Sequence, residues 1–558
     1  MKKTCFLFIF FVCFILFSNI SYSNGHRDIG FIKPMQLPFN LAGSFAEPRK
    51  DHFHSGIDIK TNGKEGEPVF AIGDGYISRI RVSPYGYGKA IYITHNNGYT
   101  SVYGHLSAFY NEIGEYITQQ HYAKQKSELD LYFDATKLPI KQGDTIAFSG
   151  NTGGSTAPHL HFEIRDSKTE HALNPLDFYP NEFYIDSISP QLNAIKITQQ
   201  NGQLQETYNL IKHANYWTTN MPIYCCSQAP LALSLEGFDK QDTSSSKNGI
   251  IKMELFKDDS LHFGYHIQSV NFDDTRMCNA FIDYHEMMNN NGYFYNCYQM
   301  PNNTLPIYVA GMNGLLQIEK HKTSHVLINC YDYNDNKTTI HLTLIGDTTN
   351  NTTACANTMN TIENKTFSSF NISFPDKAFY KKEDIIQVQK NASKKCLSDT
   401  FMIAGKYSII PLQQAAKIRF NSAIKKNRSK IIIVRQDFFG KENALKTKSD
   451  KHNFYADTKE LGSFYLKYDT TKPIIELIHL PQQDVNKNIK IKIIDVLSRI
   501  DSYNGYIDNN WVNFYYDAKN DEITYQLDEH CTKGEHLLKI TVTDKVGNKQ
   551  TLVQKFNY

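Results

Sequence analysis

Residues 150–164, GNTGGSTAPHLHFEI, decide what the first part of this chain can be. A glycine-rich loop leads into a segment in which His159 and His161 alternate with Leu160 and Phe162. Because successive side chains of a β-strand point to opposite faces, a strand here would put both imidazoles on one face and the apolar side chains on the other. Two histidines on one strand face are half of a metal site, but a pair of surface histidines gives the same pattern. The interpretation therefore depends on whether the chain supplies the other half.

Candidates for the other half lie upstream. Residues 49–60, RKDHFHSGIDIK, place His54 four residues before Asp58, where an alternating apolar strand begins. A carboxylate that faces inward from such a strand needs a partner, because burying it unpaired is costly, and a metal ion would be such a partner. His105 ends the second arm of a hairpin whose turn is NNG at residues 96–98. With 20 histidines in the chain, each of these fragments alone is a weak signal.

Short alternating strands with polar turns run through the chain and predict a mainly β protein. Two later runs look like copies of one module. The first opens on DSISP (186–190) and closes on HVLINCYDYNDN (325–336), and the second opens on DTTKP (469–473) and closes on HLLKITVTDKVGN (536–548). Such runs predict β-sandwich modules of the Ig-like type. The polar segment 111–135 has no clean period, so we predict an excursion from the first sheet that is partly helical.

Composition limits the remaining possibilities. The 558 residues are enough for several domains, and 59 Lys and Arg against 57 Asp and Glu give no electrostatic reason to expect a nucleic-acid partner. Lys2 and Lys3, an apolar run at 5–17 and a small-x-small site at 21–23 are typical of an export signal. The apolar run is too short for a comfortable membrane span, so we expect no stable transmembrane anchor, with an uncleaved anchor as the alternative.

Cysteine usage separates the histidine-rich region from the rest of the chain. Of ten cysteines, none lies between residues 24 and 224, so that region uses neither disulfides nor thiolate ligands. An exported chain is permitted disulfides, and Cys278 with Cys297 is one conceivable pair, although spacing does not fix the connectivity.

Taken together, the motifs have a family resemblance. HSGID, DGYI, YGYG, HNNGYTSVYGHLS and GDTIAFSGNTGGSTAPHLHFEI occur in this order within about residues 40–180. They resemble the lysostaphin-type (LytM-like) zinc metallopeptidases that cut peptidoglycan peptides, and the longer pattern looks like exported members from the Bacteroidetes that carry β-rich modules behind the peptidase. The resemblance implies Zn²⁺ held by His54, Asp58 and His161. It places the family's two non-ligand, catalytic histidines on His105 and His159, so all five positions are filled as an active member requires.

Several roles stay open at this point. One of His105 and His159 would take a proton from water while the other would stabilise the oxyanion or assist the leaving amine. Glu163 lies on the histidine face of the predicted strand and is an alternative base. Three side chains near the motifs could line a peptide groove, namely Arg49, Tyr85 and Tyr87, and His52 could support a ligand or simply be exposed.

The sequence therefore predicts an exported zinc metalloendopeptidase, in the periplasm, at the outer-membrane surface or secreted, that hydrolyses peptide cross-links of peptidoglycan. One alternative is a non-catalytic cell-envelope binding protein or an activator of another wall hydrolase. Another is a surface adhesion or gliding function in the C-terminal modules, which could bind wall, surface or protein partners. The predicted domains are a signal peptide (1–23), a LytM-like zinc peptidase domain (24–184), an Ig-like β-sandwich (185–350), a β-rich module of uncertain type (351–468) and a C-terminal Ig-like β-sandwich (469–558).

Overall fold

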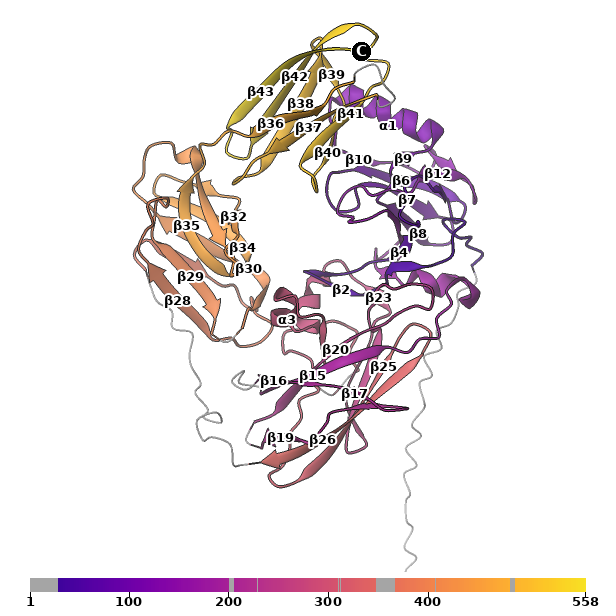
Figure 1. Ribbon diagram of the computed structural model, residues 1–558, viewed down its shortest axis with the longest axis vertical. Coiled ribbons are helices and arrows are strands. Elements are labelled where there is room, and N and C mark those ends of the chain that lie inside the picture. Colours follow the sequence, from indigo (N-terminus) through magenta and orange to yellow (C-terminus); the bar gives the residue numbers. More distant parts are fainter. Residues whose placement is uncertain are drawn as a thin grey trace, which may run out of the picture.

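The computed structural model describes residues 29–199, 205–227, 229–309, 311, 313–347, 367–406, 408–481 and 487–558. The protein is mostly β, with 47% strand and 7% helix, as the sequence predicts. Four β-rich units follow one another around a ring, and the last returns to the side of the first (Figure 1). We name them the first domain (residues 29–184) and the second, third and fourth modules (185–347, 367–468 and 469–558).

The first domain is built on one antiparallel sheet. Its strands in spatial order are β1 (Leu41–Gly43), β4 (Ile57–Lys60), β13 (His159–Asp166), β8 (Tyr99–Gly104), β7 (Lys89–His95), β6 (Gly75–Val82) and β10 (Leu129–Tyr132). The predicted hairpin is confirmed, since β7 and β8 pair across the turn in which Gly98 has φ +87°. β13 pairs with β4 on one side and with β8 on the other, which brings three motifs that are distant in sequence onto neighbouring strands.

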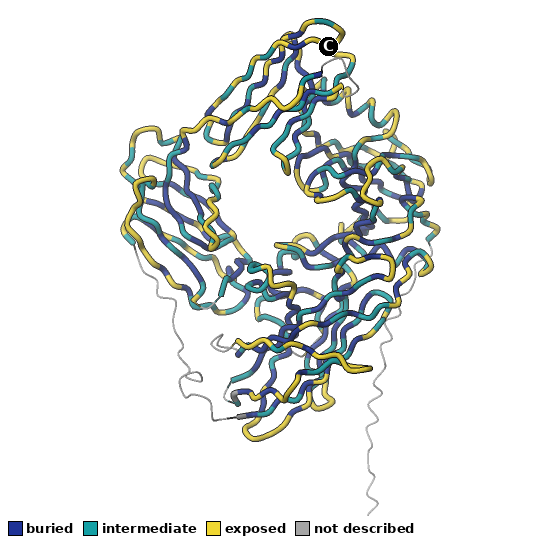
Figure 2. The backbone as a smooth tube through the Cα atoms, viewed as in Figure 1, coloured by how far each residue is buried: buried dark blue, intermediate teal, exposed yellow. Residues whose placement is uncertain are grey.

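The two faces of β13 have different environments. Leu160, Phe162 and Ile164 are fully buried in the apolar core of the first domain. His159 and His161 alternate with them and face the other side, as the period of two predicts. In Figure 2 buried backbone runs through the sheets of every unit, the first domain included. The apolar face therefore anchors the strand while the polar face is free to carry chemistry.

Smaller elements complete the first domain. The predicted excursion contains α1 (Asn111–Lys124), which ends where Gln125 adopts a left-handed φ of 47°, and it returns to the sheet as β10. A second, three-stranded sheet consists of β5 (Pro68–Phe70), β12 (Thr145–Phe148) and β9 (Ala108–Phe109). β12 leads directly to the glycine-rich loop before β13.

The second module has two sheets. One contains β16 (Gln205–Asn209), β15 (Gln191–Gln199), β20 (Leu231–Phe238) and β24 (Phe294–Asn296), and the other contains β17 (Ile211–Lys212), β18 (Trp217–Thr218), β26 (Lys337–Asp347), β25 (Thr323–Tyr331), β21 (Lys252–Lys257) and β22 (Ser260–His266), with β19 (Ile223–Cys226) beside β26. Its buried side chains form one continuous cluster with those of the first domain, and β23 (Ser269–Val270) pairs with β14 (Ala172–Leu173). These two units therefore pack as one body.

The third and fourth modules each enclose a separate core between two sheets. The third has β27 (Phe370–Ser373), β30 (Pro411–Asn421), β34 (Asn453–Glu460) and β33 (Lys448–Ser449) facing β28 (Ile385–Lys390), β29 (Thr400–Gly405), β35 (Gly462–Tyr468), β31 (Ile431–Gln436) and β32 (Glu442–Ala444). The fourth has β36 (Ile474–His479), β37 (Asn488–Ile494), β41 (Glu522–Gln526) and β40 (Tyr515–Asp517) facing β39 (Asn510–Val512), β38 (Ile500–Ile507), β42 (Glu535–Asp544) and β43 (Lys549–Asn557). The Ig-like assignment of the modules stays a prediction.

The fourth module closes the ring against the first domain. The hydroxyl of Tyr122 on α1 donates a hydrogen bond to Asp528, and its ring stacks on His530 with centroids 3.7 Å apart. Tyr515 donates to the carbonyl oxygen of Ser83 at 3.2 Å, and the Lys519 ammonium donates to a carbonyl oxygen of the glycine-rich loop. Segments about 400 positions apart in sequence therefore share one interface.

Of two further predictions, the structure contradicts one and does not test the other. Cys278 and Cys297 are free and buried, so this conceivable disulfide is not formed. The predicted signal peptide lies outside the described residues. Within the described part of the chain, no helix combines the length and hydrophobicity that crossing a membrane requires.

Candidate metal centre and active site

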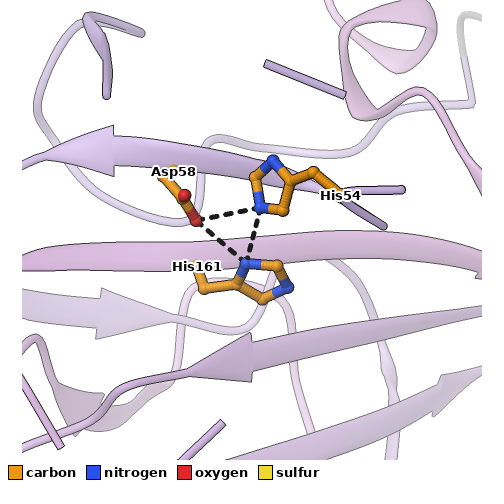
Figure 3. A group of neighbouring side chains, drawn as sticks. All are labelled: His54, Asp58 and His161. Atoms are coloured by element: carbon orange, nitrogen blue, oxygen red, sulfur yellow. Dashed lines mark hydrogen bonds and ion pairs between the residues drawn. The ribbon is translucent and has the colours of Figure 1, made fainter. Parts of the chain in front are cut away.

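Three potential ligand atoms converge beside β13 (Figure 3). His54 Nε2 lies 3.1 Å from Asp58 Oδ1 and 3.0 Å from His161 Nδ1, and His161 Nδ1 lies 2.9 Å from Asp58 Oδ1. His161 and Asp58 are direct cross-strand partners of β13 and β4, and His54 comes from the turn before β4. All three side chains are buried. The strand register therefore assembles the cluster.

The far side of each imidazole fixes its tautomer. His54 Nδ1 donates to the carbonyl oxygen of Ser44 at 2.8 Å, and His161 Nε2 donates to Glu163 Oε1 at 2.8 Å. In the neutral rings the opposite nitrogens, His54 Nε2 and His161 Nδ1, carry lone pairs that face the carboxylate oxygen of Asp58. A neutral imidazole with one N–H bonded to a carbonyl or a carboxylate is the usual form of a metal-ligating histidine.

A cation fits this donor set. Three potential ligand atoms face one another at 2.9–3.1 Å, so one cation placed among them would bind all three at once. Ligands about 2.0–2.1 Å from a tetrahedral Zn²⁺ lie about 3.3 Å apart, within a few tenths of an ångström of these separations. Two imidazoles and one carboxylate are also a usual set for a hydrolytic zinc site that keeps one position open.

The second oxygen of Asp58 is held by a cation from the protein itself. Arg49 Nη2 donates to Asp58 Oδ2 at 2.7 Å and to Glu47 Oε1 at 2.8 Å. Burial alone would raise the pKa of the Asp58 carboxyl, but the three neighbouring histidines lower that pKa well below its usual range. The arginine orients the carboxylate so that Oδ1 points at the two histidines, a role different from the predicted lining of a groove.

Two more histidines stand next to the cluster. His105 and His159 have ring centroids 4.8 Å apart, and that of His105 is 5.7 Å from the ring of His161. His105 Nδ1 donates to Thr152 O and His159 Nδ1 to Ala157 O, both at 2.8 Å. Burial, together with the neighbouring His161 and His159, lowers the pKa of His105 to about 3, so this imidazole is neutral near pH 7. His159 Nε2 is buried without a hydrogen bond, 3.3 Å from Asp58 Oδ1.

The five residues that the sequence singled out thus lie in one cluster, and comparison with known proteins points the same way. Residues 52–123 and 128–175 match the model of peptidase family M23. The first domain is an M23 domain. Residues 351–469 match the model of a Zu5-like domain, a separate similarity that concerns the third module.

Individual relatives match about a fifth to a quarter of this chain. An uncharacterized metalloprotease of Haemophilus influenzae is 32% identical over 22% of this chain and 20% of its own, and the DD-carboxypeptidase/endopeptidase Mpg of Neisseria meningitidis is 36% identical over 20% of each chain. The catalytic domain of lysostaphin from Staphylococcus simulans is a solved structure with 30% identity, a TM-score of 0.17, and coverage of 23% of this chain and 78% of that one. The chain spans about a fifth of the length of the first two relatives.

Two glycine-containing loops of the M23 domain lie beside the ligand cluster and contact each other closely. Gly154 N donates to Gly86 O at 2.8 Å, and Lys89 N donates to Thr152 Oγ1 at 3.0 Å. Gly153 has φ +72°, and a Cβ on it would lie 2.3 Å from Gly88 N, so only glycine allows the loops to approach this closely. The YGYG and GNTGG motifs are therefore parts of one structural feature.

The other residues considered from the sequence have mostly supporting places. Tyr87 stacks on His161 with centroids 4.9 Å apart and donates to Glu163, whereas Tyr85 is exposed. Glu163 is fully buried and bonded on all sides, which is unsuited to a base that must reach a substrate. His52 Nδ1 contacts the backbone oxygen of Lys50, outside the cluster. Sequence reasoning missed that Glu163 orients His161, although its i+2 spacing on β13 carried that signal.

Replacing Glu163 tests this orienting contact. In Glu163→Gln the amide cannot supply the charge that accepts the His161 N–H, so we expect metal affinity to fall about 10–100-fold. A competition titration of Zn²⁺ against a chromophoric chelator measures the change. The exposed Glu115→Gln on α1 removes the same charge far from the cluster and should bind like the unmodified chain. Equal affinity in both variants would show that Glu163 only packs the site.

Proposed function

We propose that this protein is an exported zinc metalloendopeptidase that hydrolyses peptide cross-links of peptidoglycan. The observation that carries the proposal is the convergence of His54 Nε2, Asp58 Oδ1 and His161 Nδ1, with two further histidines beside them. The similarity of the M23 domain to proteins named endopeptidase and lysostaphin supports the reaction class.

The cluster would hold Zn²⁺ through His54, Asp58 and His161. When bound, zinc supplies a Lewis acid that polarises a peptide carbonyl and lowers the pKa of water to about 7. The protein's own part is to keep the two imidazoles in the ligating tautomer through Ser44 and Glu163, and to orient Asp58 through Arg49. These contacts hold the ligands rigidly, which hydrolysis at a fixed carbonyl requires.

His105 and His159 would carry the proton transfers. Each uses Nδ1 to bind a backbone carbonyl, so Nε2 is the nitrogen that could accept or return a proton. A neutral imidazole can take the proton of the attacking water and, once protonated, either stabilise the oxyanion or give that proton to the leaving amine. Both imidazoles lie beside the ligand cluster, so either could take the first of these steps and the other the second.

The substrate would approach along the junction between the M23 domain and the fourth module. A cavity of about 640 Å³ lies there. Glu65, Asn151 and Thr152 line one wall, and Lys490, Tyr515 and Lys519 contribute to the other. Because Thr152 O also holds His105, this cavity adjoins the proposed active site. A polar wall contributed by the fourth module is consistent with a branched, charged substrate rather than an apolar one.

Mass analysis of fragments released from purified peptidoglycan tests the proposal. The full chain loaded with Zn²⁺ should convert cross-linked dimers into monomers, and the masses of the two products should sum to that of the dimer plus one water per bond cut. The same chain kept metal-free with a chelator should release none, and Zn²⁺ added back should restore cleavage. Sacculi that stay intact in the presence of zinc-loaded protein, across substrates with different cross-links, would overturn the proposal.

A further inference from the structure

A cluster made of carboxylates alone lies outside the M23 site. Asp186, Asp239 and Asp332 of the second module each offer an oxygen within 4.8 Å of the others. Asp186 precedes β15, Asp239 directly follows β20, and Asp332 directly follows β25. All three are buried. Three strand ends of one module therefore bring three acidic groups to its junction with the M23 domain.

The fourth module repeats this arrangement. Asp469, Asp495 and Asp544 also have ligand oxygens within 4.8 Å of one another. Asp469 precedes β36, Asp495 directly follows β37, and Asp544 is the last residue of β42. Asp469 and Asp186 each stand five positions before the first strand of their module. The second cluster thus has the same place in its module as the first, at the junction with the preceding unit.

One asparagine holds each cluster in the same way. Asn336 donates from its backbone N to Asp332 Oδ1 at 2.9 Å, and from Nδ2 to Asp332 Oδ2 at 2.8 Å and to Asp186 O at 3.0 Å. Asn548 donates from N to Asp544 Oδ1 at 2.7 Å, and from Nδ2 to Asp544 Oδ2 at 2.7 Å and to Asp469 O at 3.1 Å. This shared frame explains the repeated Asp-x-x-x-Asn endings of the two modules.

Each cluster contains a buried carboxylate oxygen with no partner. Asp239 is 2% exposed and Asp469 is 1% exposed, and in each the Oδ1 atom accepts no hydrogen bond. Among the described residues, no lysine or arginine forms an ion pair with any of the six carboxylates. Burying such an oxygen without a donor or a cation is costly.

The electrostatics of the first cluster agree with this interpretation. Burial, reinforced by Asp332 and Asp186, raises the pKa of Asp239 to about 8, and burial together with Asp186 raises that of Asp332 to about 7. In the second cluster, burial and the neighbouring Asp469 and Asp544 raise the pKa of Asp495. In the part of the chain that the structure describes, both clusters thus lack a positive group of the protein that would stabilise their ionised carboxylates.

We propose that each cluster is a Ca²⁺ site that stiffens the junction between its module and the preceding unit. The donors that converge are all oxygen atoms, which hard cations prefer, whereas the M23 cluster offers nitrogen to a softer metal. Ca²⁺ tolerates irregular oxygen geometry, while Mg²⁺ requires a near-ideal octahedron, so clusters spread over three strand ends suit the larger ion.

The junctions explain what such sites would do. Tyr184, at the end of the M23 domain, donates to Asp186 Oδ2 at 3.2 Å, and Asp469 N donates to Lys430 O of the third module at 2.8 Å. A cation at each cluster would tie the preceding unit to the strand ends of the next module. The two sites would thereby fix the curvature that returns the fourth module to the M23 domain (Figure 1).

Calorimetric titration with CaCl₂ tests both sites on the full chain. The protein is first stripped of metal and then given one equivalent of Zn²⁺, so that the histidine cluster is occupied. We expect two Ca²⁺ bound per chain, one in Asp239→Asn, one in Asp495→Asn and none in the double variant. Asparagine keeps the size of the carboxyl group, and circular dichroism confirms that each variant is folded.

Charge-matched controls separate binding from general electrostatics. Asp259→Asn in the second module and Asp501→Asn in the fourth remove an exposed carboxylate from the same units and should keep two sites. MgCl₂ in place of CaCl₂ should bind at least about tenfold more weakly. No heat from the unmodified chain at millimolar Ca²⁺, a stoichiometry unchanged by the Asp239 and Asp495 variants, or tighter binding of Mg²⁺ would each overturn the proposal. None of these results depends on peptidase activity.

Discussion

His161→Ala should abolish both metal binding and cleavage of peptidoglycan by the full chain. The substitution removes one of three converging ligand atoms and leaves a buried carboxylate and one imidazole, a set too small for a stable zinc site. Zinc contributes several kcal/mol to hydrolysis, and about 1.4 kcal/mol corresponds to a factor of ten, so we expect turnover to fall about 10³-fold or more. Metal content after dialysis and fragment release from sacculi are the two measurements.

His171→Ala is the matched control for this variant. His171 lies in the same domain, ten positions further along, and none of its side-chain atoms contributes to the cluster. It should bind one equivalent of zinc and cut sacculi like the unmodified chain. A His161→Ala protein that is folded, free of zinc and still active would show that the reaction does not use this cluster.

The core of the site was accessible from sequence because it depends on local periodicity. The alternation of His159 and His161 with apolar residues fixes which face of β13 each side chain takes. His54 and Asp58 could be found because a carboxylate in an apolar strand needs a partner. That they lie beside His161 depends on the register of β4 against β13. The residues alone do not give this register; the resemblance to a known family indicated it before the structure showed it.

Other features depend on contacts that sequence does not encode locally. The hydrogen bond from His54 to the carbonyl of Ser44 involves a backbone atom, which no side-chain pattern signals. The closure of the ring joins Tyr122 to Asp528, two ordinary surface types in distant segments. The carboxylate clusters of the second and fourth modules could be predicted from sequence only in part. Their repeated Asp and Asn endings were visible, whereas Asp239 and Asp495 are single acids after apolar strands and gain meaning only from the fold.

Variants of the two non-ligand histidines should separate catalysis from metal binding. We expect His105→Asn and His159→Ala each to keep one equivalent of zinc, because neither side chain belongs to the ligand set. Turnover should fall about 10²–10⁴-fold, the usual contribution of a positioned proton-transfer group. Asparagine is chosen at position 105 because His105 has φ +59°, a left-handed conformation that asparagine tolerates better than alanine. Zinc content and the rate of fragment release are measured on the same preparations.

The same pair of variants decides between an enzyme and a wall-binding protein. A chain that acts only by binding peptidoglycan or a partner hydrolase has no use for a proton acceptor 4.8 Å from a second imidazole. In that case both variants and the unmodified chain would bind sacculi equally and none would release fragments. Loss of cleavage with zinc and sacculus binding retained is instead the result expected of a hydrolase. The backbone contacts that hold both imidazoles beside the ligand cluster argue for this outcome, since a binding surface has no need of two positioned proton-transfer groups.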